Sequence, residues 1–131
     1  MASFFRTYLE MKTGGYTRTV GSGSTSLRVH RYTVPKNRYA IVFMTSVTIS
    51  SSAGGWVTLM PGTQFFVPGT PDPVPGFERI GVGVPEPFSQ AHMVAGQLIL
   101  QADEQLLSDD SGEVGSTLAA SWTIFEFALG T

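Results

Sequence analysis

The sequence of 131 residues contains no cysteine and only two histidines. Without cysteine the chain forms neither a disulfide framework nor a thiolate nucleophile, and a cysteine zinc site is excluded. The histidines, His30 and His92, have none of the H-x-x-H or H-E-x-x-H spacings that bind a catalytic metal. We therefore expect both to be structural or surface residues, and we expect a protein that is not an enzyme and has no cofactor.

Charged residues are scarce as well. They make up 14% of the chain, against roughly 25% in a typical soluble domain, so a large part of the surface should be uncharged. The net charge of −2 provides no basic surplus, which argues against nucleic acid as a partner. The chain also lacks a signal-peptide pattern and any apolar run near the length of a membrane span, so we expect synthesis in a cytoplasm and no membrane contact.

The few charges are segregated along the chain. Residues 1–38 hold seven basic side chains and one acidic one, whereas residues 39–131 hold one basic and nine acidic side chains. Basic N-terminal strands lying beside acidic C-terminal strands within one fold would explain this division, because opposite charges on neighbouring strands attract. The alternative is head-to-tail complementarity between subunits, since opposed charges fix orientation across an interface.

The residues that are present predict an all-β fold. Runs of Val, Ile, Thr, Phe and Tyr are bounded by Gly, Pro, Asn and Ser, and several short strands at such spacing predict an antiparallel β-sandwich, jelly-roll-like in form. The segment from residue 96 to 107 also fits a helical turn. The predicted strands are Phe4 to Met11, Tyr16 to Val20, Leu27 to Val34, Arg38 to Ile49, Trp56 to Met60, Phe77 to Val84, Gly96 to Ala102 and Thr117 to Leu129.

Residues 1–26 are expected to form an N-terminal strand or arm, followed by a sandwich domain over residues 27–131. The stretch from Gly14 to Ser26 is rich in Gly, Ser and Thr and predicts a flexible connection. The aromatic residues Phe4, Phe5 and Tyr8 precede it and need burial. The arm could return to its own sheet or reach a neighbouring subunit.

An acidic run from Asp103 to Glu113 gathers five carboxylates around a Ser-Gly turn. Carboxylate oxygens are ligands for Ca²⁺, but the spacing does not match an EF-hand. We interpret the run as a solvated loop without a metal.

The most unusual segment is PGTQFFVPGTPDPVPGF, Pro61 to Phe77, within a Pro-rich stretch over residues 61–87. Proline disfavours helix and favours an extended chain, while the large apolar side chains here should not be left together in water. The segment should therefore lie extended against an apolar surface, either its own sandwich or a neighbouring subunit. The apolar residues are Phe65, Phe66, Val67, Val74 and Phe77, and together with Phe4, Phe5 and Tyr8 they form the predicted interface.

Two long stretches resemble the small β-sandwich structural proteins of tailed-bacteriophage virions. These stretches are RYTVPKNRYAIVFMTSVTIS and AHMVAGQLILQADEQLLSDDSGEVGSTLAASWTIFEF, and the resemblance covers about residues 31–128. In that family a strand ending in Val-Pro, a short turn and a Tyr-Ala strand open the sandwich. An Ala-Gly turn introduces a later strand, and a Ser/Gly-rich loop precedes a final strand with aromatic and acidic residues.

The resemblance implies a non-enzymatic virion component, a capsid decoration or tail protein, that assembles as a homo-oligomer and contacts other virion proteins. By analogy with that family we expect a trimer. The alternative function is a carbohydrate-binding sandwich such as a receptor-binding domain. Its stacking face would use the rings of Trp56, Tyr32, Tyr39 or Trp122.

Overall fold

The computed structural model describes residues 7–50, 54–62, 80–84, 92–94 and 96–129, and these residues contain nine β-strands. The strands are β1 (Tyr8–Thr19), β2 (Ser26–Thr33), β3 (Arg38–Ser50), β4 (Gly55–Pro61), β5 (Ile80–Val84), β6 (His92–Val94), β7 (Leu98–Leu100), β8 (Gln105–Gly112) and β9 (Thr117–Ala128).

The strands form two antiparallel sheets that pack face to face. One sheet has the order β1-β9-β3-β7 and the other has the order β2-β8-β4-β5-β6. Consecutive strands lie in opposite sheets except for β4, β5 and β6, which follow one another in one sheet, and β1 to β4 pair with β9, β8, β7 and β5. This is the connectivity of a jelly roll, so the predicted all-β sandwich is confirmed.

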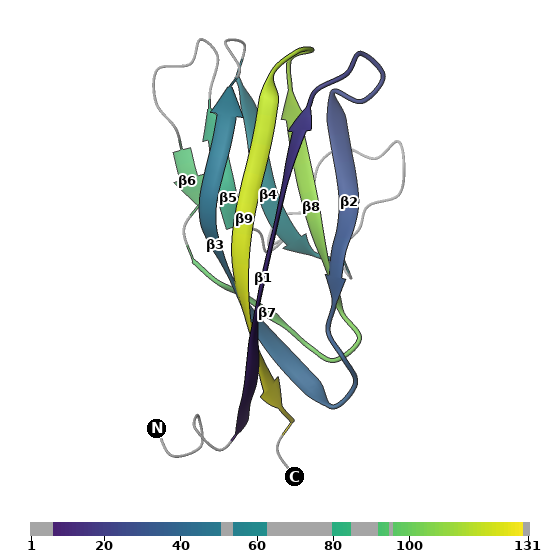
Figure 1. Cartoon of the computed structure of the whole chain (residues 1–131), viewed down its shortest axis with the longest axis vertical. Helices are drawn as coiled ribbons and strands as arrows, with labels where there is room; N and C mark the ends of the chain where they lie inside the picture. The colour runs from purple at the N-terminus through teal and green to yellow at the C-terminus, as the bar shows by residue number, and fades with distance from the viewer. Residues whose placement is uncertain (1–6, 51–53, 63–79, 85–91, 95, 130–131) are drawn as a thin grey trace.

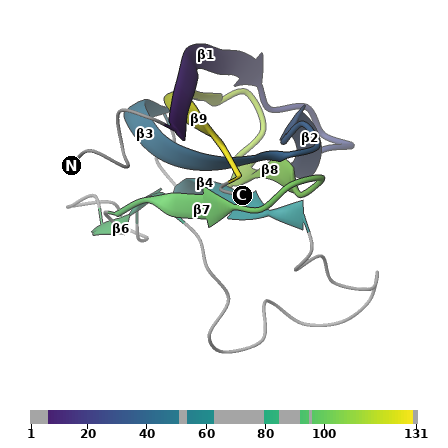
Figure 2. The ribbon, with the colours of Figure 1, turned by 90° about the horizontal axis from the view of Figure 1, so that it is seen from below.

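The two layers are visible from the side and from the end (Figures 1 and 2). In Figure 1, β1, β9 and β3 run along the long axis in front of β8 and β4, and the β1–β2 and β8–β9 connections lie at the upper end. The start of β1 pairs with the end of β9, through Tyr8 and Phe127, at the lower end.

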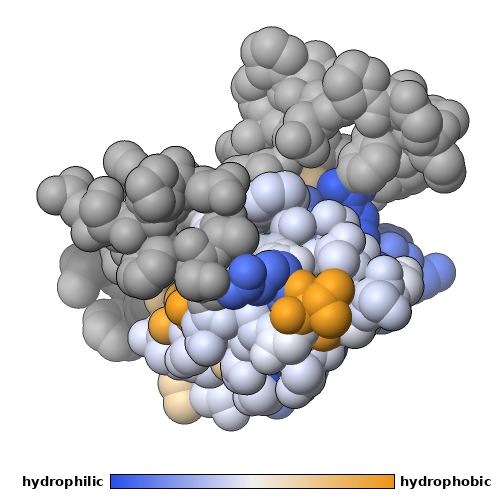
Figure 3. All heavy atoms as spheres, turned by 90° about the horizontal axis from the view of Figure 1, so that it is seen from above, coloured by the Kyte–Doolittle hydropathy of each residue, from blue (hydrophilic) through white to orange (hydrophobic). Residues whose placement is uncertain are grey.

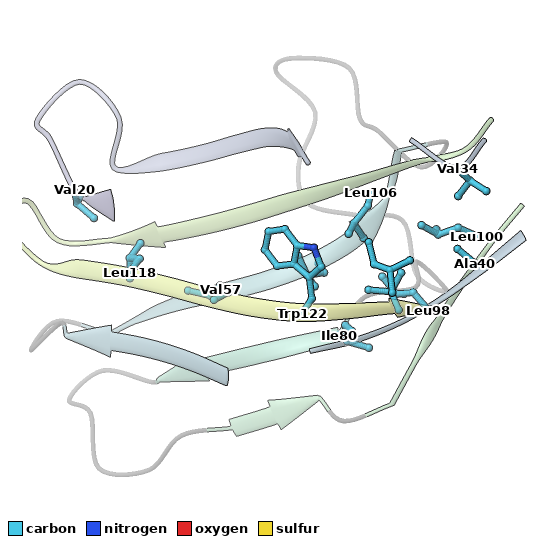
Figure 4. Close-up of a cluster of buried hydrophobic side chains, with 14 residues drawn as sticks. Val20, Val34, Ala40, Val57, Ile80, Leu98, Leu100, Leu106, Leu118 and Trp122 are labelled. Atoms are coloured by element: carbon cyan, nitrogen blue, oxygen red, sulfur yellow. The ribbon is translucent and has the colours of Figure 1, made fainter. Parts of the chain in front are cut away.

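Apolar side chains from both sheets fill the space between the layers. Trp122 lies centrally in this core, among Val57 from the opposite sheet, Leu98 from β7 and Leu106 from β8 (Figure 4). Alternate residues of β9, Leu118 to Ile124, point into the core, as expected for a strand with one buried face. Burial of such side chains stabilises each by about 2 kcal/mol.

The acidic run is not a solvated loop, so that prediction is wrong. Residues 105–112 form β8, which lies between β2 and β4, and both Asp109 and Asp110 are buried. They are tolerated because each forms an ion pair with an arginine, Arg28 and Arg18 respectively. The helical alternative for residues 96–107 is also wrong, because β7 and β8 are strands joined by a turn in which Asp103 has φ 68°.

The predicted flexible connection from Gly14 to Ser26 is wrong for its first half. Residues 14–19 belong to β1, which is one strand of 12 residues in place of the two predicted strands. The remaining turn is fixed by main-chain hydrogen bonds to the β8–β9 turn, from Val20 N to Ser116 O and from Gly115 N to Val20 O. The described part of the N-terminal arm therefore returns to its own sheet.

The other predicted strands agree with the structure in type and differ at their ends. β2, β3, β4 and β9 match within a few residues, and β5 matches the predicted Phe77–Val84 strand over its described residues 80–84, whereas β6 was not predicted. Residues 63–79 lie outside the described part of the chain, so the predicted extended course of the Pro-rich segment is not addressed by the structure.

Candidate functional site

Two polar contacts join the two sheets near their edge strands β1 and β2. In the first, the hydroxyl of Tyr16 on β1 donates a hydrogen bond of 2.7 Å to Asp110 Oδ2 on β8 of the opposite sheet. Arg18 Nε donates to the other carboxylate oxygen at 2.9 Å. The guanidinium of Arg31, on β2, lies 4.0 Å above the Tyr16 ring.

The second contact repeats this arrangement with the sheets exchanged. The hydroxyl of Tyr32 on β2 donates to Glu126 Oε2 on β9, and Lys12 from β1 lies 5.7 Å above the Tyr32 ring. Lys12 Nζ also donates to Glu126 Oε2 at 3.1 Å, and Arg38 Nη1 donates to Oε1 at 2.6 Å. Each sheet thus sends a tyrosine to a buried carboxylate of the other, which ties the layers together.

Burial and hydrogen bonding shift the pKa in opposite directions for the carboxylate and in the same direction for the tyrosines. Burial acts to raise the pKa of Glu126, yet hydrogen bonds from Tyr32, Lys12 and Arg38 outweigh it and hold that pKa below its ordinary value. Burial, together with the hydrogen bond to a carboxylate, raises the pKa of Tyr16 and of Tyr32, so both hydroxyls remain protonated. These are structural contacts between fully paired groups.

These contacts explain the segregation of charge along the sequence. Lys12, Arg18, Arg28 and Arg38 pair with Glu126, Asp110 and Asp109 from the C-terminal part of the chain. The prediction that basic N-terminal strands lie beside acidic C-terminal strands is therefore confirmed for these residues.

The residues considered for catalysis are placed as follows. His30 Nε2 lies 2.7 Å from Thr33 Oγ1, and His92 begins β6, where its side chain lies outside the description. Among the described residues, no group of three or more His, Asp or Glu side chains is arranged to hold a metal ion. No helix in the described ranges is long and apolar enough to cross a membrane.

The outer face of the four-stranded sheet has a different composition. Because the even-numbered residues from Leu118 to Ile124 point into the core, the odd-numbered residues of β9 and their partners point outward. Six rows of outward residues run across β1, β9 and β3. They are Tyr8-Phe127-Tyr39, Met11-Phe125-Ile41, Thr13-Thr123-Phe43, Gly15-Ser121-Ser46, Thr17-Ala119-Thr48 and Thr19-Thr117-Ser50. None of these residues is charged, and we call this surface the neutral face.

One half of the neutral face is aromatic and apolar. The Tyr39 ring stacks on Phe127 with centroids 5.0 Å apart, and the Tyr8 ring meets Phe127 edge-on at 5.8 Å. Phe43 contacts Phe125 edge-on at 5.9 Å. These rings contact Phe127 but leave the outermost side chains in solvent, with exposed fractions of 37 to 53% for Tyr8, Met11, Phe43 and, on β7, Ile99. We call this half the aromatic end.

The other half carries hydroxyl groups, and we call it the hydroxyl end. Thr45 Oγ1 lies 2.7 Å from Ser121 Oγ, which also contacts Ser46 Oγ at 2.5 Å. The adjoining end of the molecule is mostly of intermediate hydropathy in the described residues, with a hydrophobic patch beside a hydrophilic one and a smaller hydrophobic area to the left (Figure 3). Serine and threonine tolerate water, so only the aromatic end has a strong tendency to be covered.

The sheet edges are protected against pairing with another chain. In the described sheets, the edge strands β6 and β7 have only three residues each. The long edge strands β1 and β2 point basic side chains inward, namely Lys12, Arg18 and Arg31. Short edges and inward-pointing charges are two ways in which natural sheets avoid edge-to-edge association.

Of the predicted interface residues, the structure describes only Tyr8, which lies in the aromatic end and contacts Phe125 and Phe127. Phe4, Phe5, Phe65, Phe66, Val67, Val74 and Phe77 lie outside the described residues. Sequence reasoning missed Met11, Phe43 and Phe125. In β1 and β9 the alternate residues that point outward lack charge, and this pattern is the signal in the sequence. It can be recognised only when the residues that point into the core are already known.

The four rings considered for carbohydrate stacking do not share a surface. Trp122 is buried in the core, and Tyr32 sends its hydroxyl to the buried Glu126. Tyr39 stacks on Phe127 in the neutral face, and Trp56, with 37% of its surface exposed, lies on β4 of the other sheet.

Comparison with known proteins found no match to a family model, to a curated protein or to a solved structure.

Proposed function

We propose that this chain is a non-enzymatic structural protein of a tailed-phage virion, a capsid decoration or tail component that assembles as a homo-oligomer. The observation that carries the proposal is the neutral face, an uncharged surface with exposed aromatic side chains on a sheet whose edges are protected. Exposed apolar patches of this kind mark protein contact sites. The trimer is the stoichiometry that the sequence resemblance favours.

The architecture supports the proposal by analogy only. Double-sheet jelly rolls occur in viral capsid proteins and also in lectins, so the fold alone does not choose between a virion and a sugar-binding role. The choice rests on the site. Carbohydrate recognition needs rings presented together, and the dispersal of Trp56, Tyr32, Tyr39 and Trp122 over different surfaces gives that alternative no support.

The virion role is tested by the composition of purified particles. Quantitative mass spectrometry of particles from cells that produce the chain should find it in many copies per particle, at a fixed ratio to the main capsid or tail protein. Its absence from washed particles, despite abundant expression, would contradict the virion role. Binding to a panel of immobilised glycans would then favour the carbohydrate alternative.

A further inference from the structure

We infer that the aromatic end of the neutral face is covered by the aromatic ends of further copies of this chain, which meet around a shared rotation axis. This inference rests on the proposed homo-oligomeric function and names the surface and the occupant. The contact would centre on Phe43 and Met11, which flank Phe125 and are among the more exposed apolar side chains of the face.

The charge pattern favours a second copy over a different protein. Near a rotation axis every residue lies close to its own copies, so a single charged residue there would repel itself. The six rows of the face contain no charge. A partner of different sequence would impose no such condition, because its own charges could be opposite to those of the face.

The charges that border the aromatic end are balanced within the chain. Arg38 Nη1 lies 2.6 Å from both Glu10 Oε1 and Glu126 Oε1, and Lys12 Nζ lies 3.1 Å from Glu126 Oε2. Two carboxylates thus face two cations at this border. Of these groups, Lys12, Glu10 and Arg38 are partly exposed and Glu126 is buried. A balanced polar rim around an apolar centre is the usual arrangement of a protein interface, and it does not repel an identical copy.

The size of the patch sets the strength of the contact. Three rows of residues across β1, β9 and β3, with Ile99 of β7 beside them, span roughly 15 to 20 Å in each direction, from the usual rise per residue and the usual spacing of strands. Two such patches in contact bury on the order of 800 Å², which is below the size of stable specific interfaces and in the range of weak contacts. The isolated chain should therefore associate in a concentration-dependent way, and many copies on one particle would strengthen the contact through multivalency.

The absence of cysteine allows a direct test by cross-linking. Phe43→Cys places one thiol in the aromatic end, and Thr48→Cys places one further along β3 in the hydroxyl end. Under mild oxidation Phe43→Cys should form a disulfide-linked dimer of the 14.1 kDa chain, while Thr48→Cys should remain mainly monomeric on a non-reducing gel. Equal cross-linking of both variants would overturn the inference, and if neither variant cross-links, the charge test below decides.

A paired charge test covers the case in which the thiol geometry is unfavourable. Met11→Glu with Phe43→Glu should raise the concentration needed for self-association by at least about tenfold, because buried like charges repel. Thr17→Glu with Thr48→Glu is the matched control, and circular dichroism confirms the fold of each variant. If Met11→Glu with Phe43→Glu still forms oligomers, the contact does not use the aromatic end, and the proposed function is unaffected. A wild-type chain that stays monomeric overturns both the inference and the homo-oligomer, while the virion role still depends on particle composition.

Discussion

At the residue scale, the carboxylate of Glu126 is the most constrained group in the described structure. It is fully buried and contacts Tyr32, Lys12 and Arg38, which hold its pKa below the ordinary value despite its burial. A carboxylate with a lowered pKa in the folded state stabilises the fold at a pH above its unfolded pKa. That contribution disappears as the pH falls through the folded pKa.

We therefore expect acid to destabilise the protein partly through this residue. The melting temperature of the wild type should fall as the pH drops below the ordinary carboxyl pKa, and Glu126→Gln should flatten that dependence. At neutral pH the same substitution should reduce the free energy of unfolding by about 1–3 kcal/mol, because it removes a charged acceptor from buried hydrogen bonds. Calorimetry between neutral and acidic pH checks both effects, and an unchanged acid dependence in Glu126→Gln would contradict this role.

Tyr32→Phe separates the hydrogen bond from the charge. It keeps Glu126 ionised and removes one donor, so it should lower the free energy of unfolding by about 1–2 kcal/mol while the acid dependence remains. The same substitution at Tyr16 should have a similar effect, because its hydroxyl makes the equivalent contact with Asp110. Urea unfolding measures both variants, and a value near zero for either would show that its cross-sheet hydrogen bond contributes little.

At the element scale, β1 depends on a glycine where it crosses the core. A Cβ atom on Gly14 would lie 2.5 Å from Trp122 Nε1, so the indole ring has to move to accept it. Gly14→Ala should destabilise the protein by about 1–3 kcal/mol through overpacking and should change the tryptophan fluorescence. Gly23→Ala, where a Cβ atom meets nothing within 4 Å, is the control and should be neutral. Equal stability of the two variants would contradict the packing of β1 on Trp122.

The acidic strand β8 leads to a second prediction at this scale. Asp109 and Asp110 are paired with Arg28 and Arg18, so a cation already neutralises each carboxylate. Addition of EDTA or of Ca²⁺ should leave the melting temperature unchanged. A fall with EDTA that Ca²⁺ reverses would show that the acidic run binds metal after all.

The same strand shows how far sequence reasoning reaches. Strands rich in Val, Ile and aromatic residues, such as β3 and β9, were predicted because their own alternation marks a buried face. β8 was missed because its two aspartates read locally as solvated, and the cations that neutralise them lie more than eighty residues earlier in the chain. Similarly, Gly14 and Gly15 read as flexible, since the indole that requires a glycine at position 14 lies on another strand.

At the scale of the whole molecule, the low charge content and the fold have a common explanation. Five of the described charged residues pair with one another on the inner side of the sheets, namely Lys12, Arg18, Arg38, Asp110 and Glu126, and the six rows of the outer face of one sheet contain no charge. The composition predicted an uncharged surface, but only strand register shows that it is a single face with an aromatic end. We propose that other copies of the chain cover this face.

The central claim is that the neutral face brings copies of the chain together, and sedimentation velocity of the wild type tests it most directly. Measured from micromolar to millimolar concentration, the weight-average mass should rise above 14.1 kDa toward a multiple of that value, and it should rise far less for Met11→Glu with Phe43→Glu. A wild-type mass that remains at 14.1 kDa over the whole range, in the absence of other proteins, would contradict the account.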